Sequence, residues 1–145
     1  LWATLQLCAE KGFDAVEFDN LDSYTRSGGR LDEGDALAFA RLLVEAADEF
    51  GLPAGQKNAA ELGARGRDEA GFAFAVTEGC HRWDECSAFT GVYGPDQVLG
   101  IEYPDDLRGT FGDACADPDR PGSLILRDRM LSPTGGLDHL FEACR

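Results

Sequence analysis

The chain has 145 residues and a formal net charge of −14, from 27 acidic and 13 basic residues. This negative charge argues against binding to nucleic acid phosphates and suits either a cationic ligand or simple solubility. With 43% hydrophobic and 28% charged residues the composition is that of a globular domain, and no apolar run is long enough for a membrane span.

The first residues are predicted to form a helix, because Leu1, Leu5, Cys8 and Ala9 fall on one stripe and Gly12 can end it. The chain therefore begins inside an element, without a methionine and without a sequence that resembles a signal peptide. We expect a further N-terminal part of the protein to precede it.

Alternating side chains predict a strand over residues 14–19, followed by a polar, glycine-containing loop from Asn20 to about Leu31. Asp32 is the expected N-cap of a long amphipathic helix that Gly51 ends. The apolar stripe of this helix is predicted from i, i+3, i+4, i+7 spacing. Its members are Phe39, Leu42, Leu43, Ala46, Ala47 and Phe50.

The rest of the sequence alternates in the same way between strands and helix-compatible stretches. Strands are predicted at Pro53–Lys57, Phe72–Thr77, Gln97–Glu102 and Ser123–Leu126, with helix-compatible stretches near 59–66, 82–88 and 104–116. These five βα-like units predict a parallel sheet with right-handed crossovers. Because a complete (β/α)8 TIM barrel needs about 250 residues, we predict a partial barrel, truncated at its N-terminus, as a single domain over residues 1–145. The alternative is a small open sheet.

Acidic side chains stand at the ends of several predicted strands. Glu17 and Asp19 share one face of the first strand, while Glu78 and Glu102 end later ones. Two carboxylates on one face of a strand lower the stability of the fold unless that face meets water or a ligand. In α/β proteins, binding clefts lie at the carboxyl ends of the parallel strands. Two carboxylates in such a cleft indicate glycosidic chemistry.

Among the five cysteines, Cys80 and Cys86 bracket a short polar segment directly after Glu78. We predict a disulfide between them, which indicates an oxidising compartment, and we expect His81 to be a loop residue. A zinc site formed by Cys80, His81 and Cys86 is the weaker alternative, because this spacing matches no familiar zinc pattern. We therefore predict no metal and no cofactor. An odd number of cysteines leaves at least one unpaired within the chain.

Three motifs occur in order: the run Lys11–Tyr24, the segment Gly55–Asn58, and the segment from Glu78 to Cys86. Together they resemble glycoside hydrolase family 114, over about Leu5 to Tyr103. The resemblance implies a (β/α)8 barrel of which this chain supplies roughly the fourth strand onward, and it implies secretion. It also implies cleavage of α-1,4-linked galactosamine-rich polysaccharide, as in endo-α-1,4-polygalactosaminidases. The chain departs from the family at Thr77 and Gly79, where Asn and Gln are frequent.

By this resemblance the catalytic pair is Asp19 and Glu78. Asp19 is the expected nucleophile and Glu78 the acid/base, and the apolar strand Phe72–Val76 can partly desolvate the Glu78 carboxyl, as a proton donor requires. Candidate substrate contacts are Glu17, Asn20, Asp22, Tyr24, Lys57, Asn58, Trp83, Glu102 and Tyr103.

Several of these contacts have an ordinary structural alternative. Lys57 and Asn58 can bind sugar hydroxyls or orient a carboxylate, but a plain ion pair explains Lys57 equally well. Trp83 and Tyr103 can offer aromatic faces to a cationic sugar, although packing explains them too. Two other functions stay open for the whole chain: a non-catalytic protein that binds cationic glycans, and an inactive fragment.

Overall fold

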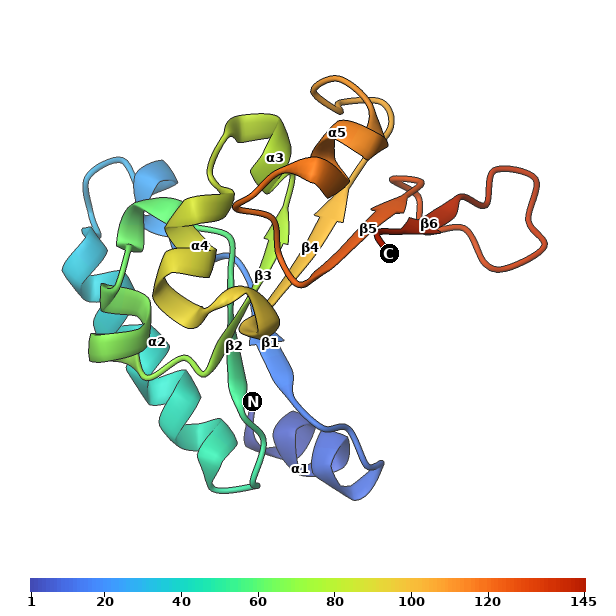
Figure 1. Cartoon of the computed structure of the whole chain (residues 1–145). Helices are drawn as coiled ribbons and strands as arrows, with labels where there is room; N and C mark the ends of the chain where they lie inside the picture. The colour runs from blue at the N-terminus through green and yellow to red at the C-terminus, as the bar shows by residue number, and fades with distance from the viewer. The chain divides into compact units, whose positions relative to one another are not determined.

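The computed structural model, drawn in Figure 1, describes all residues from 1 to 145. They divide into two compact units, Leu1–Ala75 and Val76–Arg145. The fold is mixed α/β. Its six strands follow the order of the chain, from β1 to β6, in a sheet that is mostly parallel. The strand β3 (Phe74–Glu78) crosses the boundary between the units.

The first unit holds two strands and most of the helical residues of the chain. Its elements are α1 (Trp2–Glu10), β1 (Val16–Phe18), the 3-10 helix η1 (Leu21–Arg26), α2 (Glu33–Asp48), β2 (Ala54–Lys57), the 3-10 turn η2 (Ala60–Leu62) and the π-helix η3 (Gly66–Ala70). β1 is parallel to β2, with Glu17 opposite Gly55.

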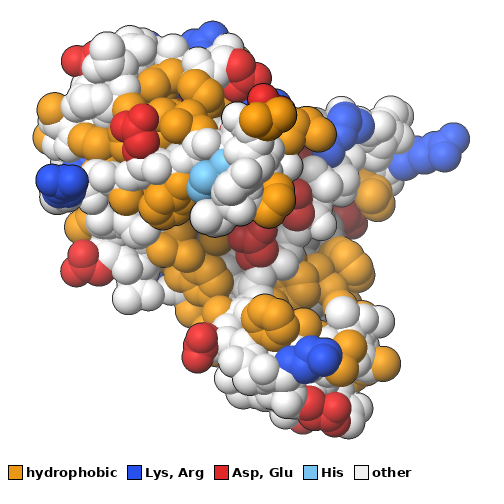
Figure 2. Space-filling view, turned by 90° about the vertical axis from the view of Figure 1, so that its right-hand side faces the viewer, with side chains coloured by type: hydrophobic (Ala, Val, Ile, Leu, Met, Phe, Trp, Pro, Cys, Tyr) orange, Lys and Arg blue, Asp and Glu red, His pale blue; other side chains and the backbone are white.

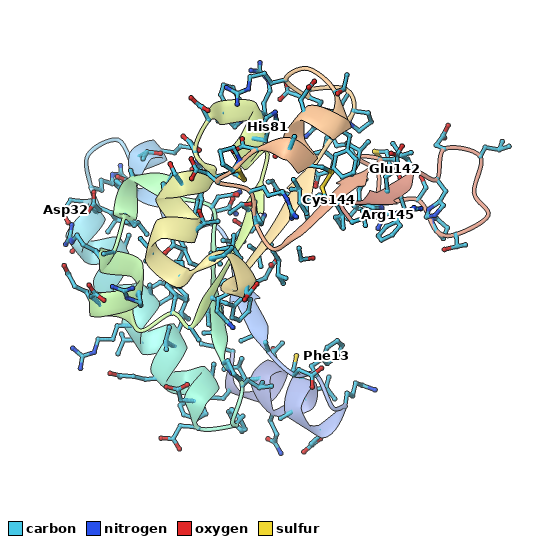
Figure 3. The ribbon with its side chains drawn as sticks, in the orientation of Figure 1. Phe13, Asp32, His81, Glu142, Cys144 and Arg145 are labelled. Atoms are coloured by element: carbon cyan, nitrogen blue, oxygen red, sulfur yellow. A yellow bond between two sulfur atoms is a disulfide. The ribbon has the colours of Figure 1, made fainter.

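Helix α2 begins as its sequence predicts. The side chain of Asp32, which is labelled in Figure 3, accepts a hydrogen bond from the Asp35 backbone N–H at 2.9 Å. In return, the Asp35 carboxylate accepts one from the Asp32 N–H at 3.0 Å. This reciprocal capping box satisfies two N–H groups that a helix start leaves without partners. The helix ends before Gly51, which has a φ of 69°.

The predicted buried stripe of α2 is partly wrong. Ala46 and Ala47 are buried, but Phe39 is 61% exposed and Leu42 is 60% exposed. The buried face lies one row of side chains away from the predicted stripe, around the helix axis. It contains Leu37, Ala40, Val44 and Ala47. Within this unit α2 contacts β1, β2, η1 and η3. Figure 2 shows that hydrophobic side chains also form patches on the surface of the molecule.

The second unit contains the remaining helices and strands. They are α3 (Cys80–Trp83), α4 (Cys86–Tyr93), the 3-10 turn η4 (Pro95–Gln97), β4 (Val98–Glu102), α5 (Phe111–Ala116), β5 (Ser123–Arg127) and β6 (Phe141–Ala143). β4 is parallel to β5, as predicted, but β6 was not predicted and runs antiparallel to β5. The buried residues Phe89, Val98, Ala114, Leu124 and Leu126 belong to the core of this unit.

The helix-compatible stretches are shorter than expected. The stretch 104–116 contains only α5, and the stretch 59–66 contains only the turn η2 and the first residue of η3. None of the helices combines the length and the apolar character that crossing a bilayer requires.

Candidate active site

In the first unit the candidate catalytic carboxylate follows β1 directly. The Asp19 side chain is 48% exposed, and its Oδ2 lies 3.6 Å from the Nζ of Lys57, whose side chain is only 8% exposed. The peptide bond between Asp19 and Asn20 is cis. An almost buried ammonium group needs a partner of opposite charge, so Lys57 restricts where the Asp19 carboxylate can point. Three roles were predicted for Lys57: binding sugar hydroxyls, orienting a carboxylate and forming a plain ion pair. The contact with Asp19 fits the last two.

The turn after β2 is fixed by a residue that the sequence analysis missed. Gln56 is 1% exposed, and its Nε2 donates to the carbonyl oxygens of Asn58 at 2.8 Å and Ala59 at 3.1 Å. Asn58 and Ala59 both have left-handed backbone conformations, with φ of 47° and 59°. Since this turn immediately follows Lys57, the buried amide of Gln56 helps to hold the end of β2.

Other predicted contacts of this unit already have protein partners. The Asp22 carboxylate accepts two hydrogen bonds from Arg26, at 2.7 and 3.1 Å, and these lower the pKa of Asp22. The Tyr24 hydroxyl donates to Glu61 at 3.1 Å, and burial together with this carboxylate raises the pKa of Tyr24. Glu17 is exposed on β1. The negative charge of Asp22 is therefore already balanced by Arg26.

A small cavity of about 280 Å³ lies beside the end of β1 in the same unit. Asp19 and Asn20 line it together with the apolar side chains of Phe39 and Leu43 from α2. This volume is close to the lower limit for small-molecule sites, which is about 300 Å³.

In the second unit the other candidate, Glu78, ends β3 and contacts Tyr103. The Tyr103 hydroxyl donates to Glu78 Oε1 at 2.5 Å, a distance typical of a charge-assisted bond. Burial of the phenol and the neighbouring carboxylate raise the pKa of Tyr103 to about 12, so that the hydroxyl keeps its proton at physiological pH.

Of the two explanations predicted for Tyr103, packing fits its surroundings better than an open aromatic face. Tyr103 is 8% exposed, and the guanidinium of Arg129 lies 4.4 Å from the centre of its ring. Arg129 in turn donates to both carboxylate oxygens of Asp105, at 2.8 and 3.1 Å. The ring is therefore already paired with a protein cation. Neither Arg129 nor Asp105 was identified from the sequence.

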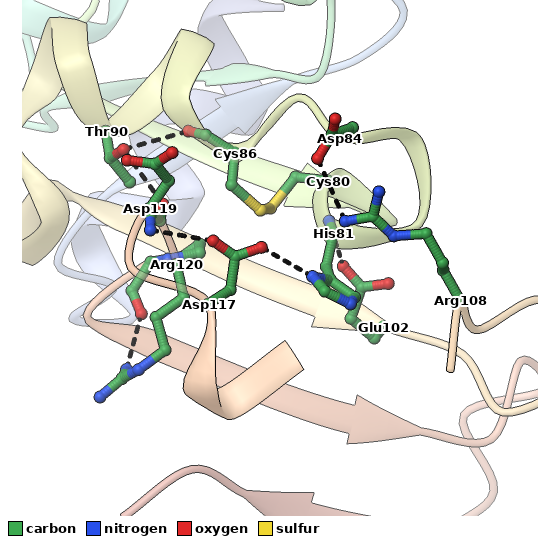
Figure 4. The surroundings of a disulfide bond; sticks show 11 residues. Cys80, His81, Asp84, Cys86, Thr90, Glu102, Arg108, Asp117, Asp119 and Arg120 are labelled. Atoms are coloured by element: carbon green, nitrogen blue, oxygen red, sulfur yellow. Dashed lines mark hydrogen bonds and ion pairs between the residues drawn. A yellow bond between two sulfur atoms is a disulfide. The ribbon is translucent and has the colours of Figure 1, made fainter. Parts of the chain in front are cut away.

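The predicted disulfide between Cys80 and Cys86 is confirmed. Its Cα atoms are 4.7 Å apart (Figure 4), within the usual range of about 4.4–6.8 Å. Both thiols of the zinc alternative are therefore joined to each other. A second disulfide, which the sequence did not identify, links Cys115 to Cys144, and Cys8 is a free thiol.

Glu102 lies where a sugar cannot reach it. It is 1% exposed, and its Oε1 accepts a hydrogen bond from the backbone N–H of His81 at 2.8 Å (Figure 4). Desolvation raises the pKa of the Glu102 carboxyl. Contrary to the prediction of substrate contact, Glu102 therefore anchors α3 within the fold.

His81 is a buried helical residue, not the loop residue that was expected. It is 6% exposed, and its Nδ1 lies 2.8 Å from Oδ2 of Asp117. The contact joins α3 to the residue that follows α5 (Figure 4).

Trp83, the last predicted aromatic contact, is 59% exposed at the end of α3. The guanidinium of Arg82 lies 4.7 Å from the centre of its ring and also donates to Asp106 at 2.9 Å. A cation of the protein already lies against this ring.

Comparison with known proteins extends these observations. The model of glycoside-hydrolase family GH114 matches residues 1–145. No curated protein matches the chain. Among solved structures, the chain is similar to the crystal structure of Aspergillus fumigatus Ega3 in complex with galactosamine, with 26% sequence identity and a TM-score of 0.78. The match covers 99% of this chain and 59% of the Ega3 chain, so this chain spans less than two thirds of that protein.

Proposed function

Because this chain belongs to glycoside-hydrolase family GH114, we propose that it cleaves α-1,4-linked galactosamine-rich polysaccharide. The family match over the whole chain is the observation that carries this proposal. Similarity to Ega3, which was crystallised with galactosamine, supports an amino sugar as the substrate unit. A net charge of −14 suits a polymer that bears ammonium groups.

The proposal extends to the fold and to the location of the protein. The parallel strands β1 and β2 and the parallel strands β4 and β5 support a (β/α)8 barrel that this single domain supplies in part. Two disulfides support an oxidising, extracellular location.

In the proposed mechanism Asp19 is the nucleophile and Glu78 the acid/base. Asp19 attacks the anomeric carbon while Glu78 protonates the departing glycosidic oxygen, and Glu78 then deprotonates the water that releases the sugar from Asp19. The positions of the two residues at strand ends support these roles: Asp19 follows β1 directly, and Glu78 is the last residue of β3. Each also has a fixed partner, Lys57 for Asp19 and Tyr103 for Glu78.

The remaining contacts in this proposal bind the polymer. Asn20 and Asn58 offer amides to sugar hydroxyls, and exposed Glu17 and Trp83 offer a charge and an aromatic edge. Asp22 and Tyr24 can join them only by exchanging partners, because Arg26 and Glu61 hold them in the structure.

Substitution of the two carboxyl groups tests the mechanism. Asp19→Asn and Glu78→Gln are nearly isosteric, so each is expected to lower the rate of oligosaccharide release from α-1,4-linked galactosamine polymer by several orders of magnitude while the fold persists. Matched controls are Asp14→Asn, which removes an exposed carboxylate before β1, and Glu85→Gln within the disulfide loop. Both controls are expected to keep the wild-type rate.

If Asp19→Asn and Glu78→Gln both retain wild-type turnover, the catalytic assignment is wrong. If the wild-type protein binds the polymer without releasing oligosaccharides, the chain acts instead as a binding protein for cationic glycans.

A further inference from the structure

Side chains at or just beyond the ends of three consecutive strands, β3, β4 and β5, contact one another. Glu78 ends β3, Tyr103 follows β4, and Arg129 lies two residues beyond β5. The contacts run in this order: the Tyr103 hydroxyl to Glu78 at 2.5 Å, then the Arg129 guanidinium to the Tyr103 ring at 4.4 Å. Asp105 closes the series with its two hydrogen bonds from Arg129.

Each contact restricts the next side chain. A planar guanidinium held by two parallel hydrogen bonds has little rotational freedom, and a cation over an aromatic face is attracted by the negative charge of that face. The Tyr103 ring is 8% exposed and so has protein on most of its surface. Its hydroxyl is thereby aimed at one carboxylate oxygen of Glu78.

We propose that Tyr103 is a positioning residue that fixes the orientation of the Glu78 carboxyl group, and that Arg129, oriented by Asp105, fixes the Tyr103 ring. This inference rests on the proposed function of Glu78 as the acid/base. It assigns a role in catalysis to side chains beyond the carboxylate pair. Proton transfer depends steeply on the direction of the donor, so loss of the hydrogen bond affects turnover more than binding.

Tyr103→Phe removes the hydroxyl and keeps the ring. We expect kcat to fall about 10- to 100-fold, with KM nearly unchanged and the melting temperature close to that of the wild type. Because the lost hydrogen bond favours the ionised carboxylate, the alkaline limb of the pH–rate profile is expected to move to higher pH. Tyr93→Phe, which removes a phenol hydroxyl from the end of α4, is the matched control and is expected to change neither kcat nor the profile.

Arg129→Lys and Asp105→Asn test the outer part of the series. Lys keeps the charge but cannot stack a planar group on the ring, and Asn weakens the hold on Arg129. Both are expected to lower kcat in the same direction as Tyr103→Phe but less. Arg41→Gln, which breaks an exposed ion pair with Glu45 on α2, is the control for loss of an arginine contact.

The outcomes separate this inference from the proposed function. Wild-type kcat and an unshifted pH profile in Tyr103→Phe would overturn the inference, even if Glu78→Gln is inactive. A wild-type protein that cleaves no galactosamine polymer would overturn both, because Glu78 would then have no acid/base role.

Discussion

Gly100, in the middle of β4, shows how closely the second unit is packed. A Cβ atom at this position would lie 2.7 Å from Leu124 Cδ1 and 2.8 Å from Pro121 Cγ. Both neighbours are among the fully buried side chains, so neither can move into solvent. The absence of a side chain at residue 100 therefore lets β5 and the segment before it approach β4.

Gly100→Ala is expected to lower the free energy of unfolding by about 1–3 kcal/mol, the usual range for overpacking a core. Gly91→Ala in α4 is the matched control, because its added methyl group meets no atom within 4 Å. In a helix, this control is expected to raise stability by up to about 1 kcal/mol. Urea unfolding measures both changes. Equal stabilities of the two variants would contradict the packing argument.

At the scale of elements, the sequence predicts best what depends on local contacts. The capping box of α2 involves residues three apart, and the glycine stop depends only on backbone conformation. The buried stripe depends on tertiary packing, because two neighbouring rows of this helix both have apolar i, i+3 or i+4 spacing. Contacts with β1, β2, η1 and η3 select the row with Leu37 and Val44 over the row with Phe39.

In the candidate site, too, the sequence predicts what local patterns determine but not the contacts that depend on tertiary structure. Asp19 and Glu78 could be assigned to strand ends because side-chain alternation is local. The same alternation makes Glu102 and Tyr103 face opposite sides of the sheet, so they cannot both reach one cleft: Tyr103 contacts Glu78, and Glu102 contacts His81. Arg129 follows a different strand, and no local pattern indicates its contact with Tyr103.

The contact between α3 and the end of α5 makes stability depend on pH. Hydrogen bonds to Asp117 from the Asp119 backbone and from His81 lower the pKa of Asp117. A carboxyl group with a lowered folded-state pKa stabilises the fold above its unfolded pKa of about 3.9, and this contribution is lost as pH falls through the folded value.

Asp117→Asn is therefore expected to be less stable than the wild type at pH 7, by about 1 kcal/mol or somewhat more. The difference should shrink as pH falls below about 4, where the wild-type carboxyl takes up its proton. Urea unfolding at a series of pH values measures it, with Asp138→Asn in an exposed loop as the control. A difference that stays constant down to the acid limit would exclude Asp117 as the titrating group.

At the scale of the whole molecule, the two disulfides close loops of very different length. Cys80 and Cys86 are six residues apart, whereas Cys115 and Cys144 are 29 residues apart. Chain-entropy arguments give about 2 kcal/mol for the short loop and about 3.5 kcal/mol for the long one. The disulfide that closes the long loop joins α5, which contains Cys115, to the residue that follows β6, Cys144. Cys144 and Glu142 are labelled in Figure 3.

Replacing Cys115 and Cys144 together with serine is accordingly expected to destabilise the protein more than replacing Cys80 and Cys86. Denaturant unfolding of the two double variants under non-reducing conditions compares them. A larger loss for the Cys80 and Cys86 pair would show that the short loop stabilises through native contacts around α3, not through chain entropy.

Strand β6 also lies at one edge of the sheet, and its backbone and side chains are what this edge presents to other molecules. It occupies the side of β5 opposite β4, is only three residues long, and carries the exposed Glu142 at its centre. Short strands and charged side chains are two means by which proteins keep a strand from pairing with another chain. In concentrated solution, a strand of a neighbouring molecule is therefore expected to pair poorly with β6, and self-association through strand pairing is disfavoured at this edge.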